Sequence, residues 1–203
     1  MITATPGFRN LALLGVPLFS LLVWGAVSGR PDDRTKPETI DATAMGTSTQ
    51  MGRVTNIKVI IYEYSTQEDR EVLMQAFVKG QNQGLVNALT KMKAVGRIAI
   101  TGTLGYDLSY IKVFPTPTGR KIRFITNRPL RYGEVYWDTQ STAYNLTAGE
   151  LDLNDTEKSK SAGVLYPAAQ LVINKEGELQ VELRQNPWNL VNIIDWRGAP
   201  EVN

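Results

Sequence analysis

Residues 96–127 read GRIAITGTLGYDLSYIKVFPTPTGRKIRFITN, and this stretch decides the fold. Apolar and polar residues alternate with a period of two in three runs, which is typical of strands with one buried face. Turn-forming residues at 102–105 and 115–119 separate the runs. Because short connections favour antiparallel pairing, the stretch predicts three successive antiparallel strands.

The same pattern continues on both sides of this stretch. Residues 54–64, rich in Val, Ile and Tyr, predict an opening strand. Residues 174–177, NKEG, predict a hairpin turn. We expect strands near 54–64, 96–102, 107–115, 120–127, 132–138, 144–153, 162–174, 177–185 and 188–194.

A helical hairpin is expected at residues 67–93. Ser65 and Thr66 each stand three residues before an acid, which is a capping-box pattern at a helix start. Gly80 ends the first helix, and the second runs from about 83 to 93. The apolar stripes that we expect in the core are Val72, Leu73, Ala76 and Phe77, followed by Leu85, Ala88, Leu89 and Met92.

These elements predict an α+β fold, because strands follow one another without βαβ alternation. We expect a large antiparallel sheet, either a sandwich or a partial barrel, with one helical hairpin and a single N-terminal transmembrane-type helix before it. The expected division is 1–28 as membrane anchor or signal segment, 29–52 as polar tether, 53–196 as sheet domain and 197–203 as tail.

Residues 11–27, LALLGVPLFSLLVWGAV, carry no charge and reach the lower end of the length that spans a bilayer. One interpretation is a secretory signal that is cleaved after Ser28, and the other is a retained anchor. The apolar run is longer than that of most signals, which favours retention. The anchor residues are Leu11, Leu14, Leu18, Phe19, Leu22 and Trp24.

The expected location is the membrane, with the soluble domain on the periplasmic side. The charge count opposes this orientation, because Arg30, Arg34 and Lys36 follow the apolar segment and only Arg9 precedes it. The signal-like start favours export. Secretion to the periplasm after cleavage is the alternative.

The amino-acid composition limits which catalytic and metal-binding groups the protein can have. The 203 residues include no Cys and no His, which removes thiolate nucleophiles, histidine bases and the commonest metal ligands. A net charge of +2 gives no global case for nucleic acid. No acid stands in an apolar context that suggests a tuned catalytic pair. We therefore expect no enzyme, no catalytic residue, no cofactor and no metal site.

The strongest local charge is a basic run between residues 112 and 131 that contains no acid. Strand alternation places Lys121 and Arg123 on one face of residues 120–127, opposite Ile122 and Phe124. The run predicts a basic binding surface for an anionic ligand, a lipid head group or an acidic partner. The alternative is a solvated sheet face whose Lys and Arg side chains guard against edge aggregation. Its residues are Lys112, Arg120, Lys121, Arg123, Arg128 and Arg131.

Three weaker features are interpreted structurally. The glycines at 102 and 105 predict positive φ at a sharp bend before Asp107. Acids at 150–157 could hold Ca²⁺ but lack an EF-hand pattern, so an exposed turn is expected. These acids are Glu150, Asp152, Asp155 and Glu157.

The aromatic residues are spaced for the faces of a sheet. Those assigned to sheet faces are Tyr132, Tyr136, Trp137, Tyr144 and Tyr166. Trp188 and Trp196 are expected to pin the last strand.

Several short segments resemble a family of small exported bacterial proteins of unknown function. The segments that carry the resemblance are residues 64–66 (YST), 84–89 (GLVNAL), 95–98 (VGRI), 102–110 (GTLGYDLSY) and 126–130 (TNRPL). The resemblance covers roughly residues 57–195 and departs at 113–114 and around 136–137. It implies export and brings no activity, cofactor or catalytic residue.

The function expected from the sequence is that of a non-catalytic, membrane-anchored accessory subunit. Its partners would be the bilayer, through residues 11–27, and a larger membrane protein complex on which its extramembrane domain docks. The alternative is a free periplasmic binding or envelope-maintenance protein whose basic hairpin binds an anionic ligand.

Overall fold

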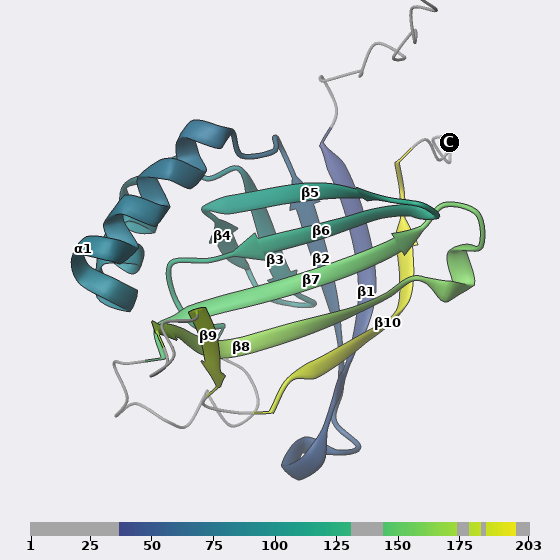
Figure 1. The fold of residues 1–203 in the computed structure, drawn as a ribbon. Helices are drawn as coiled ribbons and strands as arrows, with labels where there is room; N and C mark the ends of the chain where they lie inside the picture. The colour runs from purple at the N-terminus through teal and green to yellow at the C-terminus, as the bar shows by residue number, and fades with distance from the viewer. Residues whose placement is uncertain (1–36, 131–143, 174–178, 184–185, 198–203) are drawn as a thin grey trace, which may run out of the picture. The chain divides into compact units, whose positions relative to one another are not determined.

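The computed structural model describes residues 37–130, 144–173, 179–183 and 186–197. One helix and ten strands lie in these ranges (Figure 1). In chain order the elements are β1 (Glu38–Gly46), the 3-10 turn η1 (Ser48–Gln50), β2 (Val54–Ile61), α1 (Gln67–Lys91), β3 (Gly96–Ile100), β4 (Tyr106–Leu108), β5 (Tyr110–Thr116), β6 (Gly119–Ile125), β7 (Leu146–Asn154), the 3-10 turn η3 (Lys158–Lys160), β8 (Ala162–Ile173), β9 (Leu179–Leu183) and β10 (Trp188–Asp195).

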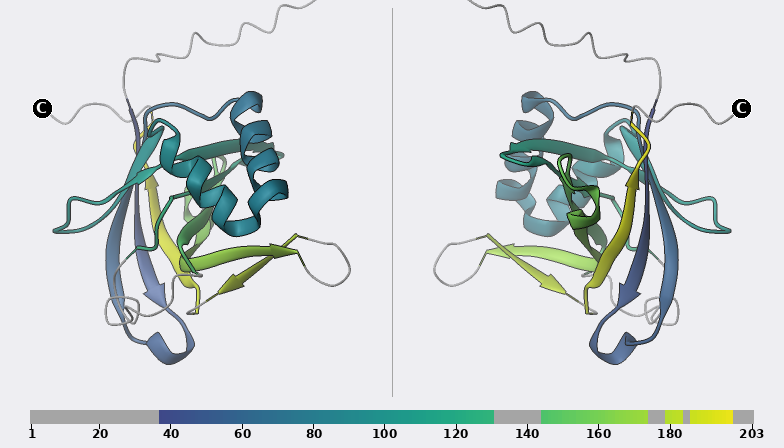
Figure 2. Two further views of the ribbon diagram at one scale, coloured as in Figure 1. Left: turned by 90° about the vertical axis from the view of Figure 1, so that its left-hand side faces the viewer. Right: turned by 90° about the vertical axis from the view of Figure 1, so that its right-hand side faces the viewer.

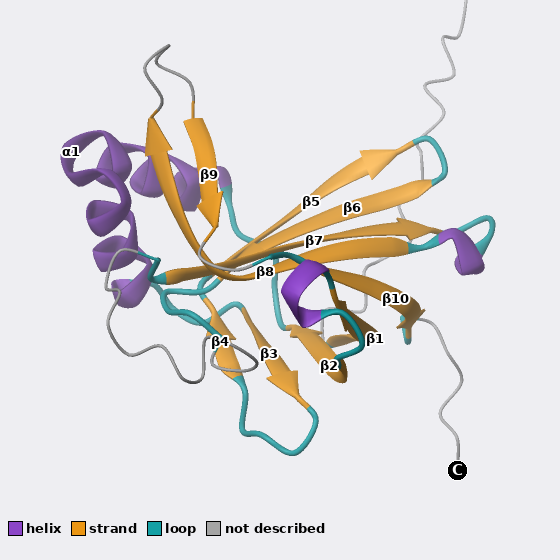
Figure 3. Ribbon diagram, turned by 90° about the horizontal axis from the view of Figure 1, so that it is seen from below, coloured by secondary structure: helices purple, strands orange, loops and turns teal. Residues whose placement is uncertain are grey.

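The strands form one antiparallel sheet in the order β4-β3-β2-β1-β10-β8-β7-β6-β5, and β9 adds to the far half of β8. The sheet curls until its first and last strands approach each other, as the end-on view in Figure 3 shows. The α+β class and the antiparallel sheet are therefore confirmed. Of the two expected architectures, the nearly closed barrel is the one observed.

The near-closure depends on Ser109, the single residue between β4 and β5. These two strands lie at opposite ends of the sheet order, so the chain steps from one edge to the other at this point. The Ser109 N–H donates to Ile125 O (3.1 Å), and beside it Ser65 N–H donates to Ile111 O (2.8 Å). The expected single strand at 107–115 is thus two strands, because the backbone changes partner at a buried serine.

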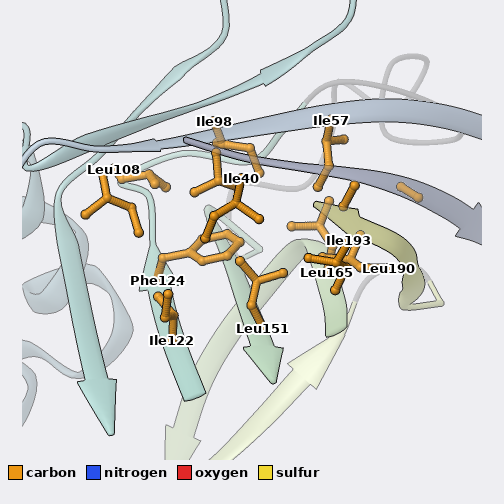
Figure 4. Close-up of a cluster of buried hydrophobic side chains, with 14 of the residues drawn as sticks. Ile40, Ile57, Ile98, Leu108, Ile122, Phe124, Leu151, Leu165, Leu190 and Ile193 are labelled. Atoms are coloured by element: carbon orange, nitrogen blue, oxygen red, sulfur yellow. The ribbon is translucent and has the colours of Figure 1, made fainter. Parts of the chain in front are cut away.

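Alternate side chains of the strands fill the interior of the barrel with a continuous apolar core. Ile40, Ile57 and Ile98 from one wall and Phe124 and Leu151 from the opposite wall belong to the same buried cluster (Figure 4). Gly149 makes room for the Phe124 ring, because a Cβ there would lie 2.1 Å from its Cζ. Buried side chains thus occupy the interior, as in other small barrels whose interior is a core.

Strand β1 corrects the expected tether at 29–52. Residues 38–46 pair with β2 on one side and with β10 on the other, so they occupy the middle of the sheet. Ile40, Ala42 and Ala44 face the core. Two of these three side chains are alanine, which gives a weak hydrophobic signal, and the residues that alternate with them, Thr39, Asp41 and Thr43, are polar. Residues 29–36 lie outside the described part of the chain.

Helix α1 begins with the expected capping box, in which Thr66 Oγ1 accepts from Asp69 N–H (3.2 Å) and Asp69 Oδ2 accepts from Thr66 N–H (2.8 Å). The backbone leaves helical geometry at Gly80 and Gln81, so α1 consists of two segments that meet at a kink (Figure 2). Gly84 lets the second segment lie against the backbone of Ala76. A second apolar cluster joins α1 to the sheet, and Val72, expected in the core, is exposed.

The remaining expected strands agree with β2, β3 and β6 to β10 to within a few residues. The expected strand at 132–138, the hairpin turn at 174–177, Tyr132, Tyr136, Trp137 and the whole anchor segment 11–27 lie outside the described residues. No helix within the described ranges combines the length and the hydrophobicity needed to cross a membrane.

Candidate functional site

The basic residues of β6 divide between the two faces of the sheet. Arg120 faces inward with Ile122 and Phe124, whereas Lys121 and Arg123 face outward. The expected alternation of residues 121–124 is therefore confirmed. Arg120, which we expected on the same binding surface, is 8% exposed, because even-numbered positions of this strand face the core.

Arg120 sits at the centre of a buried polar group at one end of the barrel, which we call the Arg120 cluster (Glu38, Tyr64, Arg120 and Asp195). The Arg120 guanidinium donates to Glu38 and, at 2.5 Å, to Asp195 Oδ2. Tyr64 donates its hydroxyl to the other Glu38 oxygen at 2.8 Å. The cluster thereby joins the first described strand, β1, and the last, β10, to β6.

The electrostatics of the cluster follow from burial. Burial raises the pKa of the Asp195 carboxyl above its ordinary value, against the lowering effect of Arg120. Burial and the neighbouring Glu38 raise the pKa of the Tyr64 hydroxyl, which therefore remains a hydrogen-bond donor. Among the described residues the Arg120 Nε has no hydrogen-bond partner. Glu38 Oε2 also lies 3.8 Å from Nη1 of Arg197, which is more exposed. Since the two carboxylates are paired with guanidinium groups, the arrangement is that of a structural ion cluster.

The outward residues of β6 form a second charged group, the β6–β7 ladder (Lys121, Arg123, Glu150 and Asp152). Glu150 accepts from Lys121 Nζ at 2.9 Å and from Arg123 Nε at 2.6 Å. Lys121 also lies 3.7 Å from Asp152. Glu150 and Asp152, which we expected in an exposed turn, lie in strand β7 and are cross-strand neighbours of the basic residues of β6. This pairing offsets the positive charge of the expected binding surface.

The pKa values of the ladder reflect the same contacts. Burial of Glu150 opposes ionisation, but hydrogen bonds from Lys121 and Arg123 dominate, and the pKa of Glu150 is lowered. The hydrogen bond to Glu150 raises the pKa of Lys121. Both groups therefore remain charged and paired at neutral pH.

The other basic residues of the expected surface are not gathered into one patch with Arg120. The Arg128 guanidinium lies over the Tyr106 ring, 5.6 Å from its centroid. Lys112 lies on β5, opposite Arg123 in the register. Arg131 is outside the described residues. The five of these basic residues that the structure describes thus have at least three different environments.

The acids near 150–157 do not converge on one point. Glu150 and Asp152 belong to the ladder, and Glu157 pairs with Lys160 at 2.7 Å. In the described part of the chain no group of three or more acidic side chains is placed to hold a metal ion. A small pocket beside Asp155, Lys158 and Asp195 has a volume of about 20 Å³, which is room for one water molecule.

The glycine-rich bend has the geometry that we expected of it. Gly102 and Gly105 have φ of 84° and 76°. Between them Leu104 is almost fully exposed, and its carbonyl oxygen accepts from Arg97 Nε at 2.6 Å. Asp107 lies 3.9 Å from Arg97. The bend connects β3 and β4 and needs glycine for its backbone angles.

Reasoning from the sequence missed Glu38, Tyr64 and Asp195 as partners of Arg120. One signal was available, because the alternation of residues 120–124 places Arg120 on the apolar side. An inward arginine requires buried carboxylates as partners. Which carboxylates these are depends on the closure of the barrel, since they lie 82 and 75 residues away along the chain.

Comparison of the chain with models of protein families, with curated proteins and with solved structures finds no match.

Proposed function

We propose that this protein is a non-catalytic accessory subunit, anchored in a membrane by residues 11–27, whose extramembrane domain docks on and braces a larger membrane protein complex. The observation that carries the proposal is the position of Glu38. This residue is ion-paired with Arg120 at one end of the barrel, and only ten residues separate it from Val27, where the apolar segment ends.

The short connection supports a domain that is held close to the bilayer. Ten residues between the apolar segment and Glu38 span at most about 35 Å when fully extended. Because Glu38 takes part in a buried ion cluster, the connection is attached to a fixed point of the fold. A domain held in this way is suited to contact a neighbour in the same membrane.

The interior of the barrel supports a role in binding through the outer surface. Apolar side chains fill it, and the charges of the Arg120 cluster contact one another. The outer faces of the strands and the turns between them therefore remain for contact with other molecules. On this proposal, the domain lies on the periplasmic side.

The alternative, a free periplasmic protein that binds an anionic ligand through a basic hairpin, has less support. Lys121 and Arg123 already contact Glu150, and Arg120 is buried with two carboxylates. An anionic ligand would have to compete with these carboxylates for the same cations.

Fractionation and intact mass test the proposal. The full-length protein, extracted from membranes in mild detergent, should retain residues 1–28 and co-purify with a constant set of partners. Leu18→Arg should release it from the membrane, because an arginine at the centre of a spanning helix costs about 2.5–3.5 kcal/mol. Thr35→Arg, which adds the same charge outside the apolar segment, is the control and should stay membrane-bound.

A soluble protein whose mass begins at or near Gly29, with no stoichiometric partner, would contradict the proposal. Protease treatment of spheroplasts tests the orientation separately. Digestion of the domain in intact spheroplasts is expected, and its protection would place the domain on the cytoplasmic side.

A further inference from the structure

The tip of the β1–β2 hairpin exposes apolar side chains at the end of the barrel opposite the Arg120 cluster. Met45 and Val54 face each other in the register and are 43% and 58% exposed. Met51, in the turn between them, is 80% exposed. In Figure 1 the tip, with η1, projects beyond the other strands. We call Met45, Met51, Arg53 and Val54 the Met51 tip.

The backbone of this tip is fixed by hydrogen bonds. Gly46 N–H donates to Arg53 O (2.9 Å), and Met51 N–H donates to Ser48 O (3.0 Å). Thr47 Oγ1 donates to Pro187 O at 2.6 Å, which ties the turn to the chain that enters β10. These hydrogen bonds hold the backbone of the tip in place. Binding to a partner would therefore cost little conformational entropy for ordering the tip.

Two features of the same turn are unfavourable for stability. Ser48 has φ of 51°, in the left-handed region that a residue with a Cβ rarely adopts. Gln50 is fully buried, and neither atom of its side-chain amide has a hydrogen-bond partner among the described residues. Strained and unsatisfied groups persist where the surroundings impose them, and they concentrate at binding sites. Here the result of the strained turn is an outward Met51.

The positive charge of the Met51 tip limits which kind of molecule can bind to it. Arg53 is exposed and has no ion pair in the described ranges, and none of the described residues between Gly46 and Val54 is acidic. A second copy of the chain would bring two Arg53 side chains together, which opposes a tip-to-tip dimer. A carboxylate at the rim of an apolar surface would match both Arg53 and its apolar neighbours.

A membrane surface fits the tip less well than a protein does. Segments that insert into the lipid interface combine Trp, Phe and Leu with several cations, whereas the tip has Met and Val with one arginine. It also lies at the far end of the nine-residue strand β1, about 30 Å from Glu38, the end of the strand that is nearer in sequence to the apolar segment. Methionine side chains adapt well to apolar grooves of proteins.

We propose that the Met51 tip is the docking site for the partner protein and inserts Met51 into an apolar groove that has a carboxylate at its rim. This inference rests on the proposed function and adds the contact surface to it. Met45 and Val54 pack on the walls of the groove, and Arg53 contacts the carboxylate.

The experiment uses the tagged full-length protein in its native host. Met51→Asp and Val54→Asp should reduce the recovered partner roughly tenfold or more, because a charge would enter an apolar groove. Leu104→Asp is the matched control, since Leu104 is 89% exposed in the β3–β4 turn, and its partner recovery should be unchanged. Equal thermal unfolding midpoints would show that all three variants fold.

A photo-reactive amino acid at position 51 then identifies the contact. The expected adduct joins position 51 to an apolar segment of the partner that contains Asp or Glu. Arg53→Glu should weaken the complex, and lysine in place of that acid on the partner should restore it. Restoration by the paired charge change supports the contact itself.

The outcomes separate the two proposals. If the wild-type protein has no stoichiometric partner, the proposed function fails, and the docking inference fails with it. If Met51→Asp and Val54→Asp retain the partner as fully as Leu104→Asp does, only the docking inference is overturned. An adduct between two copies of this chain, or with lipid, overturns it as well.

Discussion

Arg120 and Lys121 are neighbours in β6, yet their charges have opposite surroundings. Arg120 is buried with Glu38 and Asp195, which come from the two ends of the described chain, whereas Lys121 contacts acids of the adjacent strand β7 at the surface. Removal of one partner of a buried ion pair costs about 3–5 kcal/mol, but exposed pairs contribute about 0–1 kcal/mol. A charged residue of β6 therefore contributes much more to stability when its side chain faces the core than when it faces the solvent.

The largest effect is expected for Arg120→Met. The substitution removes the cation that Glu38 and Asp195 share and leaves Glu38 only the more distant Arg197, at 3.8 Å. It should lower the free energy of unfolding by about 3–5 kcal/mol. Urea denaturation measures this value. Lys121→Met, the control at the next position, should have a much smaller effect. Similar losses for the two variants would remove the distinction between the faces of β6.

The pH dependence of stability should differ in sign between the two carboxyl groups Asp195 and Glu150. The pKa of Asp195 is raised in the folded protein, so the stability that it contributes is present below its unfolded pKa of about 3.9 and is lost as pH rises through the folded value. The pKa of Glu150 is lowered, so its contribution is present above about pH 4.3 and is lost as pH falls through the folded value.

Asp195→Asn and Glu150→Gln make this contrast measurable. Asp195→Asn should be at least as stable as the wild type at pH 7, because Glu38 still balances Arg120, and the difference should shrink as pH falls toward 4. Glu150→Gln should be less stable than the wild type at pH 7 and should lose this difference in acid. Unfolding curves between pH 3 and 7 give both trends, and parallel trends would refute the assignment.

The smallest effect concerns salt. Glu150→Gln should cost about 1 kcal/mol or less at low ionic strength, and this cost should fall in 1 M NaCl, where the Debye length is about 3 Å. The cost of Arg120→Met should change little, because salt does not screen a buried cluster well. Equal salt sensitivity of the two variants would show that the Arg120 cluster is open to solvent.

Much of the fold is predictable from local patterns. The alternation around Ile98, Ile122 and Leu151 locates their strands, and Thr66 with Asp69 locates the start of α1. These patterns involve residues that are close together in the sequence, so they can be recognised in one sequence without a structure. The chemical composition likewise limits the catalytic groups without any structure.

Other features depend on tertiary contacts that local patterns do not contain. Strand β1 carries Ala42 and Ala44 on its inner face, and these small side chains resemble tether composition until two neighbouring strands bury them. The partners of Arg120 become identifiable only once β1 and β10 are adjacent. The exposed Met51 lies in a turn in which Ser48 is left-handed, a conformation that a serine in the sequence does not predict.

The adjacency of β1 and β10 also sets the order of folding events. Trp196 donates to Asp41, a residue 155 positions earlier in the chain. A chain synthesised from its N-terminus completes β1 long before β10, so one edge of β1 remains without its partner until β10 has been made. Pairings of such long range fold slowly. During this interval the open edge of β1 is a site for mispairing, and occupation of that edge by β10 ends the hazard.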